Sequence, residues 1–152
     1  VHGADRIEIL FSANPGQSPK SLKKVASGGE LSRLSLAMII ASADPNQTLT
    51  RIFDEIDAGI GGETAHKVGE FLHQTGQQGQ SLCVTHLAQV AARADFQLKV
   101  EKRAKTSKTL VDIVALSAED RVAELARMLG SGQSDISRQH ALALLRGEAV
   151  EV

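Results

Sequence analysis

The sequence predicts an α/β fold in which helices cover a parallel sheet. Residues 49–53 have the length of a short strand, although Thr50 and Arg51 interrupt its apolar run, and residues 81–85 have the composition of a buried strand. A helical pattern follows each of them, at residues 63–75 and 86–94. A helix usually makes the crossover that joins parallel strands, so this alternation favours parallel pairing.

The composition is that of an ordinary globular domain, or of one lobe of a larger domain. The chain has 152 residues, of which 42% are apolar and 23% charged. Four Phe and no Trp or Tyr argue against nucleic-acid binding by base stacking. A net charge of −1 does not indicate a polyanionic partner.

The sequence also bears on the compartment. A single cysteine, Cys83, excludes an internal disulfide and fits a reducing environment. No apolar run reaches the ~18 residues that a membrane span needs, and no secretory segment opens the chain. We therefore expect a cytoplasmic protein with no membrane partner.

The first part of the chain predicts a strand, a loop and an apolar helix. Residues 6–11 alternate apolar and polar side chains, and residues 14–19 contain two Pro and one Gly, typical of a loop. A helix is predicted over 29–43, with Ser27 as its N-cap. Its middle, residues 34–41, is apolar nearly all round, which predicts a buried helix. A strand so near the first residue suggests a chain cut from a longer polypeptide.

The last third of the chain predicts a β-hairpin and two helices. Residues 96–102 and 109–116 alternate in character around a turn rich in Lys, Ser and Thr. Ser117 and Asp120 resemble a capping box. The helix behind them has one apolar face, made of Val122, Leu125, Ala126 and Leu129. A glycine-rich break then precedes a last helix at 136–145.

Two glycines at the start of the apolar helix form a candidate anion site. Gly28 and Gly29 leave the backbone N–H groups of the first turn bare, and a helix N-terminus carries about half a positive charge. Ser27 adds a hydroxyl donor. A simpler interpretation of the same residues is a turn that only caps a buried helix.

Two carboxylates follow the predicted strand at 49–53. The carboxyl end of a strand is where ligands bind in open α/β sheets. We expect Asp54 to hold Mg²⁺ through a water, because this ion sheds its hydration shell reluctantly. Glu55 would orient or deprotonate an attacking water. The alternative is an exposed acidic turn in which Asp57 caps the next segment.

A histidine follows the second apolar strand. A neutral imidazole at that place is able to donate to a γ-phosphate oxygen, which makes His86 a candidate phosphate sensor. The plainer explanation is a capping or surface histidine. The other four histidines and the cysteine lack the spacing of a zinc site. The usual phosphate-holding loop, G-x-x-x-x-G-K-[ST], is absent, so these residues predict half of an ATP site.

Five basic residues gather in and around the predicted hairpin turn: Lys99, Lys102, Arg103, Lys105 and Lys108. Such a cluster is able to contact nucleic-acid phosphates. Glu101 and Asp112 lie among them, and the chain is nearly neutral. These two facts favour a solvated hairpin.

In chain order, these segments resemble the motifs of the ABC-type ATPases. Ser27-Gly28-Gly29-Glu30 resembles their signature motif, residues 52–55 their Walker B strand, and His86 their switch histidine. Residues 57–62 look like the D-loop region. Glu30, where transporter ATPases more often have Gln, points to the SMC branch, which acts on chromosomes.

Three longer strings look specifically like one bacterial member of that branch, which repairs DNA double-strand breaks: Ser27–Arg33, Phe53–Gly62 and Val84–Ala91. This resemblance implies that residues 1–152 form a single C-terminal lobe of an ATPase head, without the P-loop lobe and the coiled coil. The fold class it implies is the parallel-sheet lobe of an ABC/SMC-type head, with flanking helices.

The same resemblance implies ATP and Mg²⁺ as cofactors of the full-length protein. Asp54 would hold the metal, and Glu55 and His86 would be catalytic. The residues expected to contact nucleotide are Ser27, Gly28, Gly29, Glu30 and Asp57. The implied partners are a second head in a homodimer, the N-terminal P-loop lobe, and DNA, at the nucleoid. Alone, the chain is expected to be inactive.

Two other classes of protein remain open. The chain is also compatible with half of another ABC-type ATPase, either a transporter or a different SMC protein. The continuation Ile-Asp-Ala-Gly, in place of the Pro-Thr-Ser-Ala of transporters, argues against the transporter. A non-catalytic dimerisation module is the other alternative, and the presence of Asp54, Glu55 and His86 argues against it.

Overall fold

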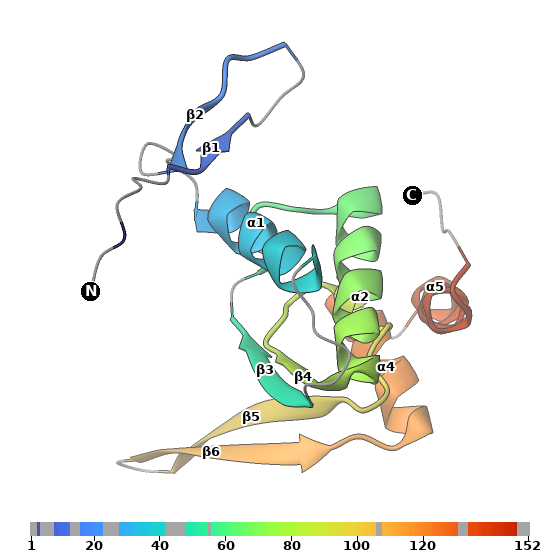
Figure 1. The fold of residues 1–152 in the computed structure, drawn as a ribbon. Helices are drawn as coiled ribbons and strands as arrows, with labels where there is room; N and C mark the ends of the chain where they lie inside the picture. Colours follow the sequence, from blue (N-terminus) through green and yellow to red (C-terminus); the bar gives the residue numbers. More distant parts are fainter. Residues whose placement is uncertain are drawn as a thin grey trace.

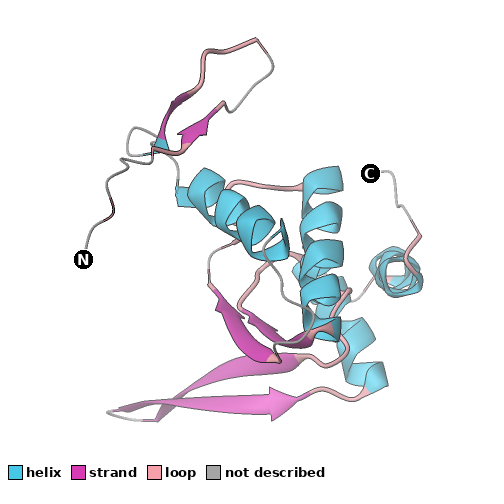
Figure 2. Cartoon of the chain, in the orientation of Figure 1, coloured by secondary structure: helices cyan, strands magenta, loops and turns pink. Residues whose placement is uncertain are grey.

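The computed structural model describes residues 3, 8–12, 16–22, 28–41, 48–54, 56–105, 108–130 and 134–148. Over these residues the fold is α/β, as predicted, with three two-stranded sheets and five helices (Figures 1 and 2). None of the described helices has both the length and the apolar character needed to cross a membrane.

A parallel strand pair lies at the centre of the fold. β3 (Leu49–Phe53) pairs with β4 (Gly79–Cys83), from Leu49 opposite Gly79 to Phe53 opposite Cys83. Helix α2 (Gly62–Gln77) makes the crossover between them, which confirms the predicted alternation. β4 begins two residues before the predicted strand. Only glycine fits at its first position, because a Cβ on Gly79 would overlap the Leu49 carbonyl oxygen.

Helices α1 (Gly28–Ala41) and α2 pack on one side of this pair and enclose the first apolar core. Its buried side chains are Leu36, Phe53, Ile56, Ala65, Val68, Leu72 and Val90. The prediction that α1 is buried all round is wrong. Leu36 is 2% exposed, but Met38 is 46% exposed, because no described element covers the outer side of the helix.

The chain's last third forms a second core. Short α3 (Ala88–Ala91), α4 (Ala118–Met128) and α5 (Asp135–Arg146) share it. The predicted apolar face of α4 packs here, with Val122, Leu125 and Ala126 buried and Leu129 partly buried. The predicted cap is confirmed: the Ser117 hydroxyl oxygen accepts from the Asp120 N–H at 3.1 Å. The expected break contains Gly130, whose φ of +85° favours glycine.

Helix α3 is shorter than the predicted 86–94, for a reason at each end. At its start, the N–H groups of His86 and Leu87 donate to the side chains of Asp57 and Thr85, and the helix begins only at residue 88. At its end, the Arg121 guanidinium donates to carbonyl oxygens of Ala91, Ala92 and Ala94. A cation on these terminal carbonyls stabilises the helix end.

Two antiparallel ribbons complete the fold. β5 (Leu98–Lys105) and β6 (Lys108–Ala115) form the predicted hairpin, which extends along the bottom of Figure 1. Near the first residue, β1 (Leu10–Phe11) pairs with β2 (Lys20–Ser21) and lies apart from the rest. The sequence did not predict β2. The predicted strand at 6–11 is realised at its last two residues, and residues 6 and 7 lie outside the described part.

Candidate functional site

The site lies at the carboxyl edge of the parallel pair. Parallel strands end at the same edge, so the segments that follow β3 and β4 lie next to each other. The Val84 N–H donates to the Phe53 carbonyl at 2.9 Å, which extends the pairing by one residue. Beyond this bond the chain turns away on both sides, carrying Asp54 and Asp57 on one segment and Thr85 and His86 on the other.

Asp57 joins the two segments. The residue is 2% exposed, and its Oδ2 accepts from the Thr85 hydroxyl at 2.5 Å and from the His86 backbone N–H at 2.9 Å. Burial alone would raise the pKa of this carboxyl group. The two hydrogen bonds, together with the positive charge of the His86 ring when it is protonated, outweigh burial, and the pKa of Asp57 lies below its ordinary value. Asp57 is therefore ionised at neutral pH.

His86 is the exposed member of this group. Its Nδ1 lies 3.1 Å from the same Oδ2 of Asp57, while its side chain is 72% exposed. The ring is thus held on one side by a buried carboxylate and open to solvent on the other. Thr85, which the sequence analysis did not single out, donates to Asp57 and accepts from the Leu87 N–H at 3.0 Å. The sequence signal that could have identified Thr85 is a hydroxyl residue directly before a histidine at the end of a strand.

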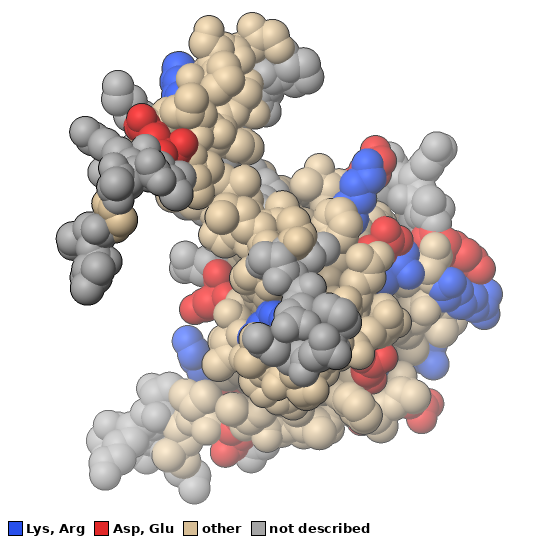
Figure 3. Space-filling model, in the orientation of Figure 1, with Lys and Arg blue, Asp and Glu red and all other residues tan. Residues whose placement is uncertain are grey.

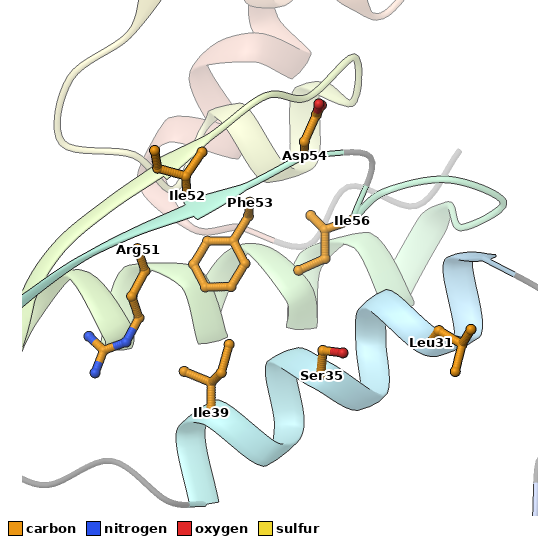
Figure 4. Close-up of a pocket in the computed structure, with 8 residues that line it drawn as sticks. All are labelled: Leu31, Ser35, Ile39, Arg51, Ile52, Phe53, Asp54 and Ile56. Atoms are coloured by element: carbon orange, nitrogen blue, oxygen red, sulfur yellow. The ribbon is translucent and has the colours of Figure 1, made fainter. Parts of the chain in front are cut away.

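Asp54 and Asp57 differ in exposure. Asp54 follows β3 directly and is exposed. In Figure 4, Asp54 and Ile52 point away from α1 and Phe53 points toward it, as the alternation of a strand requires. Ile56, in the turn after β3, also points toward α1. Between β3 and α1 lies an open pocket of about 450 Å³, whose lining includes Leu31, Ser35 and Ile39 of α1.

The start of α1 lies at the same end of the pocket as Asp54. In Figure 4, Leu31 in the first turns of α1 is at the Asp54 end, and Ile39 is at the other end, near Arg51. The helix begins at Gly28, one residue before its predicted start, so Gly28, Gly29 and Glu30 form its first turn. Ser27 and Glu55 lie outside the described residues, and so does the side chain of Glu30.

Asp54 alone does not form a Mg²⁺ site, because other ligands must complete the coordination shell of the ion. Among the described residues no three His, Cys, Asp or Glu side chains gather to hold a metal ion by themselves. Mg²⁺ is commonly bound by one or two carboxylates, with waters and phosphate oxygens completing its shell. An exposed carboxylate at the strand edge fits that donor set.

Cys83, at the end of β4, is a protonated thiol held in a partly buried position close to the two carboxylates. Burial, followed by the charges of Asp57 and Asp54, raises the pKa of its thiol to about 12. Its Sγ donates to the Val84 carbonyl at 3.6 Å. A thiol with so high a pKa is not a nucleophile at neutral pH.

One member of the basic cluster, Lys99, has a structural explanation. The Lys99 ammonium lies 3.2 Å from Glu124 and 3.6 Å from Glu101, so it ties the hairpin to α4. The side chains of Arg103, Lys105 and Lys108 lie outside the described part. On the face drawn in Figure 3, basic and acidic side chains are interspersed among uncharged residues.

Comparison with known proteins identifies close sequence relatives. The chain is 50% identical to the DNA repair protein RecN of Vibrio cholerae over 131 residues, which is 86% of the chain and 24% of that protein. It is 45% identical to RecN of Treponema pallidum, over 97% of the chain and 26% of that protein. The RecN of Bacillus subtilis is 41% identical, over 95% of the chain and 25% of that protein. No family model matches.

The fold also has a solved relative. A chain from a study of ATP-driven dimerization and DNA-stimulated activation of SMC ATPases matches with a TM-score of 0.54 and 22% identity. The match covers 82% of the present chain and 81% of that chain, and at this identity it bears on the fold alone. The predictions of an SMC-type fold and of a RecN-like sequence are confirmed. The chain spans about a quarter of the length of the RecN proteins it matches.

Proposed function

We propose that this chain is the C-terminal lobe of an ATP-binding head in a RecN-like protein that repairs DNA double-strand breaks. One structural observation carries the proposal. Asp57 contacts His86, 29 residues further along, at the carboxyl edge of β3 and β4, where α/β proteins bind ligands and where Asp54 directly follows β3. The sequence identity to RecN proteins supplies the link to DNA repair.

Each residue of the site has a role in this proposal. Asp54 holds Mg²⁺, and Glu55 orients or deprotonates the attacking water. The backbone of Gly28 and Gly29, at the start of α1, faces the γ-phosphate of ATP bound to a second head. When bound, Mg²⁺ would neutralise negative charge on the phosphate oxygens. His86 lies where the reacting water and phosphate meet.

The proposed partners are inferred in part from a phosphate-binding motif that the chain lacks. Its 152 residues contain no G-x-x-x-x-G-K-[ST] string, so the loop that cradles the phosphates belongs to another segment, the N-terminal P-loop lobe. The ATP-bound state is a homodimer of heads, and hydrolysis separates them. DNA is engaged through the longer protein, in the cytoplasm at the nucleoid.

A chimera tests the proposal directly. In it, this chain replaces the matching segment of the Vibrio cholerae RecN. The chimera is expected to hydrolyse ATP, and the isolated chain is not. Glu55→Gln keeps the shape of the side chain but removes its basicity, so it should lower kcat by about 10²–10⁴-fold while ATP-bound dimers accumulate. Asp54→Asn should instead weaken Mg²⁺-dependent ATP binding.

The matched control is Glu63→Gln. Glu63 is an exposed side chain that pairs with Lys67 on the surface of α2, at 2.7 Å. Turnover and dimer population should stay unchanged in this variant. Full ATPase activity of Glu55→Gln, or turnover by the isolated chain, would refute the proposed site.

A further inference from the structure

Asp57 occupies a rigid position. The preceding residue, Ile56, is 2% exposed within the first core. The Asp57 carbonyl accepts from the Ile60 N–H at 3.4 Å, closing a turn that contains Gly59 at a φ of +70°. The carboxylate is therefore fixed from its own segment as well as by its partners on the segment after β4.

The contact between the Asp57 carboxylate and the His86 ring determines which ring nitrogen carries the hydrogen when the ring is neutral. An ionised carboxylate only accepts hydrogen bonds, so the nitrogen that faces it must carry a hydrogen. That nitrogen is Nδ1, 3.1 Å from Oδ2. In a neutral imidazole only one nitrogen is protonated, so Nε2 then has a bare lone pair on the exposed side of the ring.

We propose that Asp57 is a positioning residue that holds neutral His86 in the Nδ1–H form and presents Nε2 as a hydrogen-bond acceptor at the strand edge. This inference assigns Asp57 to the histidine, and not to the nucleotide. It also revises the expected role of His86. A neutral ring in this form has no hydrogen to offer a γ-phosphate oxygen, and it accepts from a donor such as the attacking water.

Burial supports this assignment. At 2% exposure, Asp57 has no free surface for a nucleotide, and its Oδ2 already receives the Thr85 hydroxyl and the His86 N–H. Buried carboxylates are stable when such donors surround them. His86 is 72% exposed, so the ring is the part of the pair that reaches the site.

The tautomer is measurable on this chain without nucleotide. Long-range ¹H–¹⁵N correlation spectra of ¹⁵N-histidine-labelled protein, recorded where His86 is neutral, are expected to show a protonated Nδ1 and a bare Nε2. In Asp57→Asn the neutral amide should let the Nε2–H form become populated. The matched control is Asp54→Asn, which neutralises the other carboxylate of this edge and should leave the tautomer unchanged.

Two results would overturn the assignment. One is an Nε2–H form in the unsubstituted chain, and the other is an unaltered tautomer in folded Asp57→Asn. If Asp57→Asn does not fold, the spectrum of the unsubstituted chain decides alone. A merely structural role predicts loss of stability without a change of tautomer.

The catalytic consequence rests on the proposed ATPase and is tested in the chimera. Asp57→Asn should lower kcat by about 10²-fold, the low end of what a positioned acid–base group contributes, with KM for ATP nearly unchanged. An unsubstituted chimera without turnover refutes the proposed function, while the spectrum still decides the tautomer. An active chimera whose kcat is unaffected by Asp57→Asn refutes the catalytic role of Asp57 alone.

Discussion

Replacing Thr85 by Val tests the hydrogen-bond network at the strand edge while keeping the shape of the side chain. The change removes the hydroxyl that donates to Asp57 Oδ2 at 2.5 Å and that accepts from the Leu87 N–H at 3.0 Å. Asp57 stays buried and ionised, with one donor fewer. Removing one partner of a buried charged group costs more than the net value of the bond, because the other partner remains desolvated.

The expected loss is about 2–3 kcal/mol of unfolding free energy at pH 7, because hydrogen bonds to charged groups contribute about 1.5–3 kcal/mol. The direction in which stability changes with pH follows from the pKa of Asp57. Its folded-state pKa lies below the ordinary 3.8, so its contribution is fully present above pH 3.8 and is lost as pH falls through the folded-state pKa. Without Thr85 that pKa rises toward 3.8, so Asp57 contributes less stability and its contribution is fully lost at a higher pH than in the unsubstituted chain.

Urea unfolding followed by circular dichroism, from pH 7 down to pH 3, measures this difference. The gap between Thr85→Val and the unsubstituted chain should shrink as Asp57 becomes protonated. Thr50→Val is the matched control, because Thr50 is exposed and bonds only the Gln80 side chain, at 3.2 Å, among the contacts described for its hydroxyl. Its effect should stay within about 0.5 kcal/mol. An equal gap at pH 7 and pH 3 would refute the reasoning.

Two further predictions concern packing and thiol reactivity. In Gly69→Ala the new Cβ would lie 2.9 Å from Arg93 Cγ and 3.2 Å from the Gln89 carbonyl oxygen, so we expect a loss of about 1–3 kcal/mol in urea unfolding. Gly76→Ala in the same helix meets nothing nearer than 4.0 Å and should stabilise by about 0.5–1 kcal/mol, and two equal effects would contradict the contact. Cys83, with a pKa of about 12, should react with a thiol reagent at pH 8 far more slowly in the folded chain than in urea, and equal rates would show the thiol to be unprotected.

Elements with a strong local pattern were predictable from sequence. The hairpin, the apolar face of α4 and its Ser117 cap each depend on residues close together in the chain, and all three are confirmed. β2 was missed because two residues, Lys20–Ser21, carry no periodicity of their own. They are a strand only because they pair with Leu10–Phe11.

The sequence predicted residues of the site but not the hydrogen bonds that join them. The sequence singled out Asp57 and His86 separately, from their places after two strands. It did not show that one carboxylate oxygen of Asp57 takes hydrogens from a segment 28 and 29 residues further along. That contact depends on the register of β3 and β4, in which Phe53 lies opposite Cys83.

The apolar run in β4 predicted a buried strand, but the outer face of the β3–β4 pair is exposed. Strands buried on both faces read as continuous apolar runs, as Leu82-Cys83-Val84 does. The helices cover only the Cys83 side, and Ile52, Leu82 and Val84 are 73%, 43% and 64% exposed on the other. A two-stranded sheet with a bare apolar face is marginal by itself. The matched RecN proteins are about four times as long as this chain, so the exposed apolar face belongs to a segment that accounts for only about a quarter of such a protein.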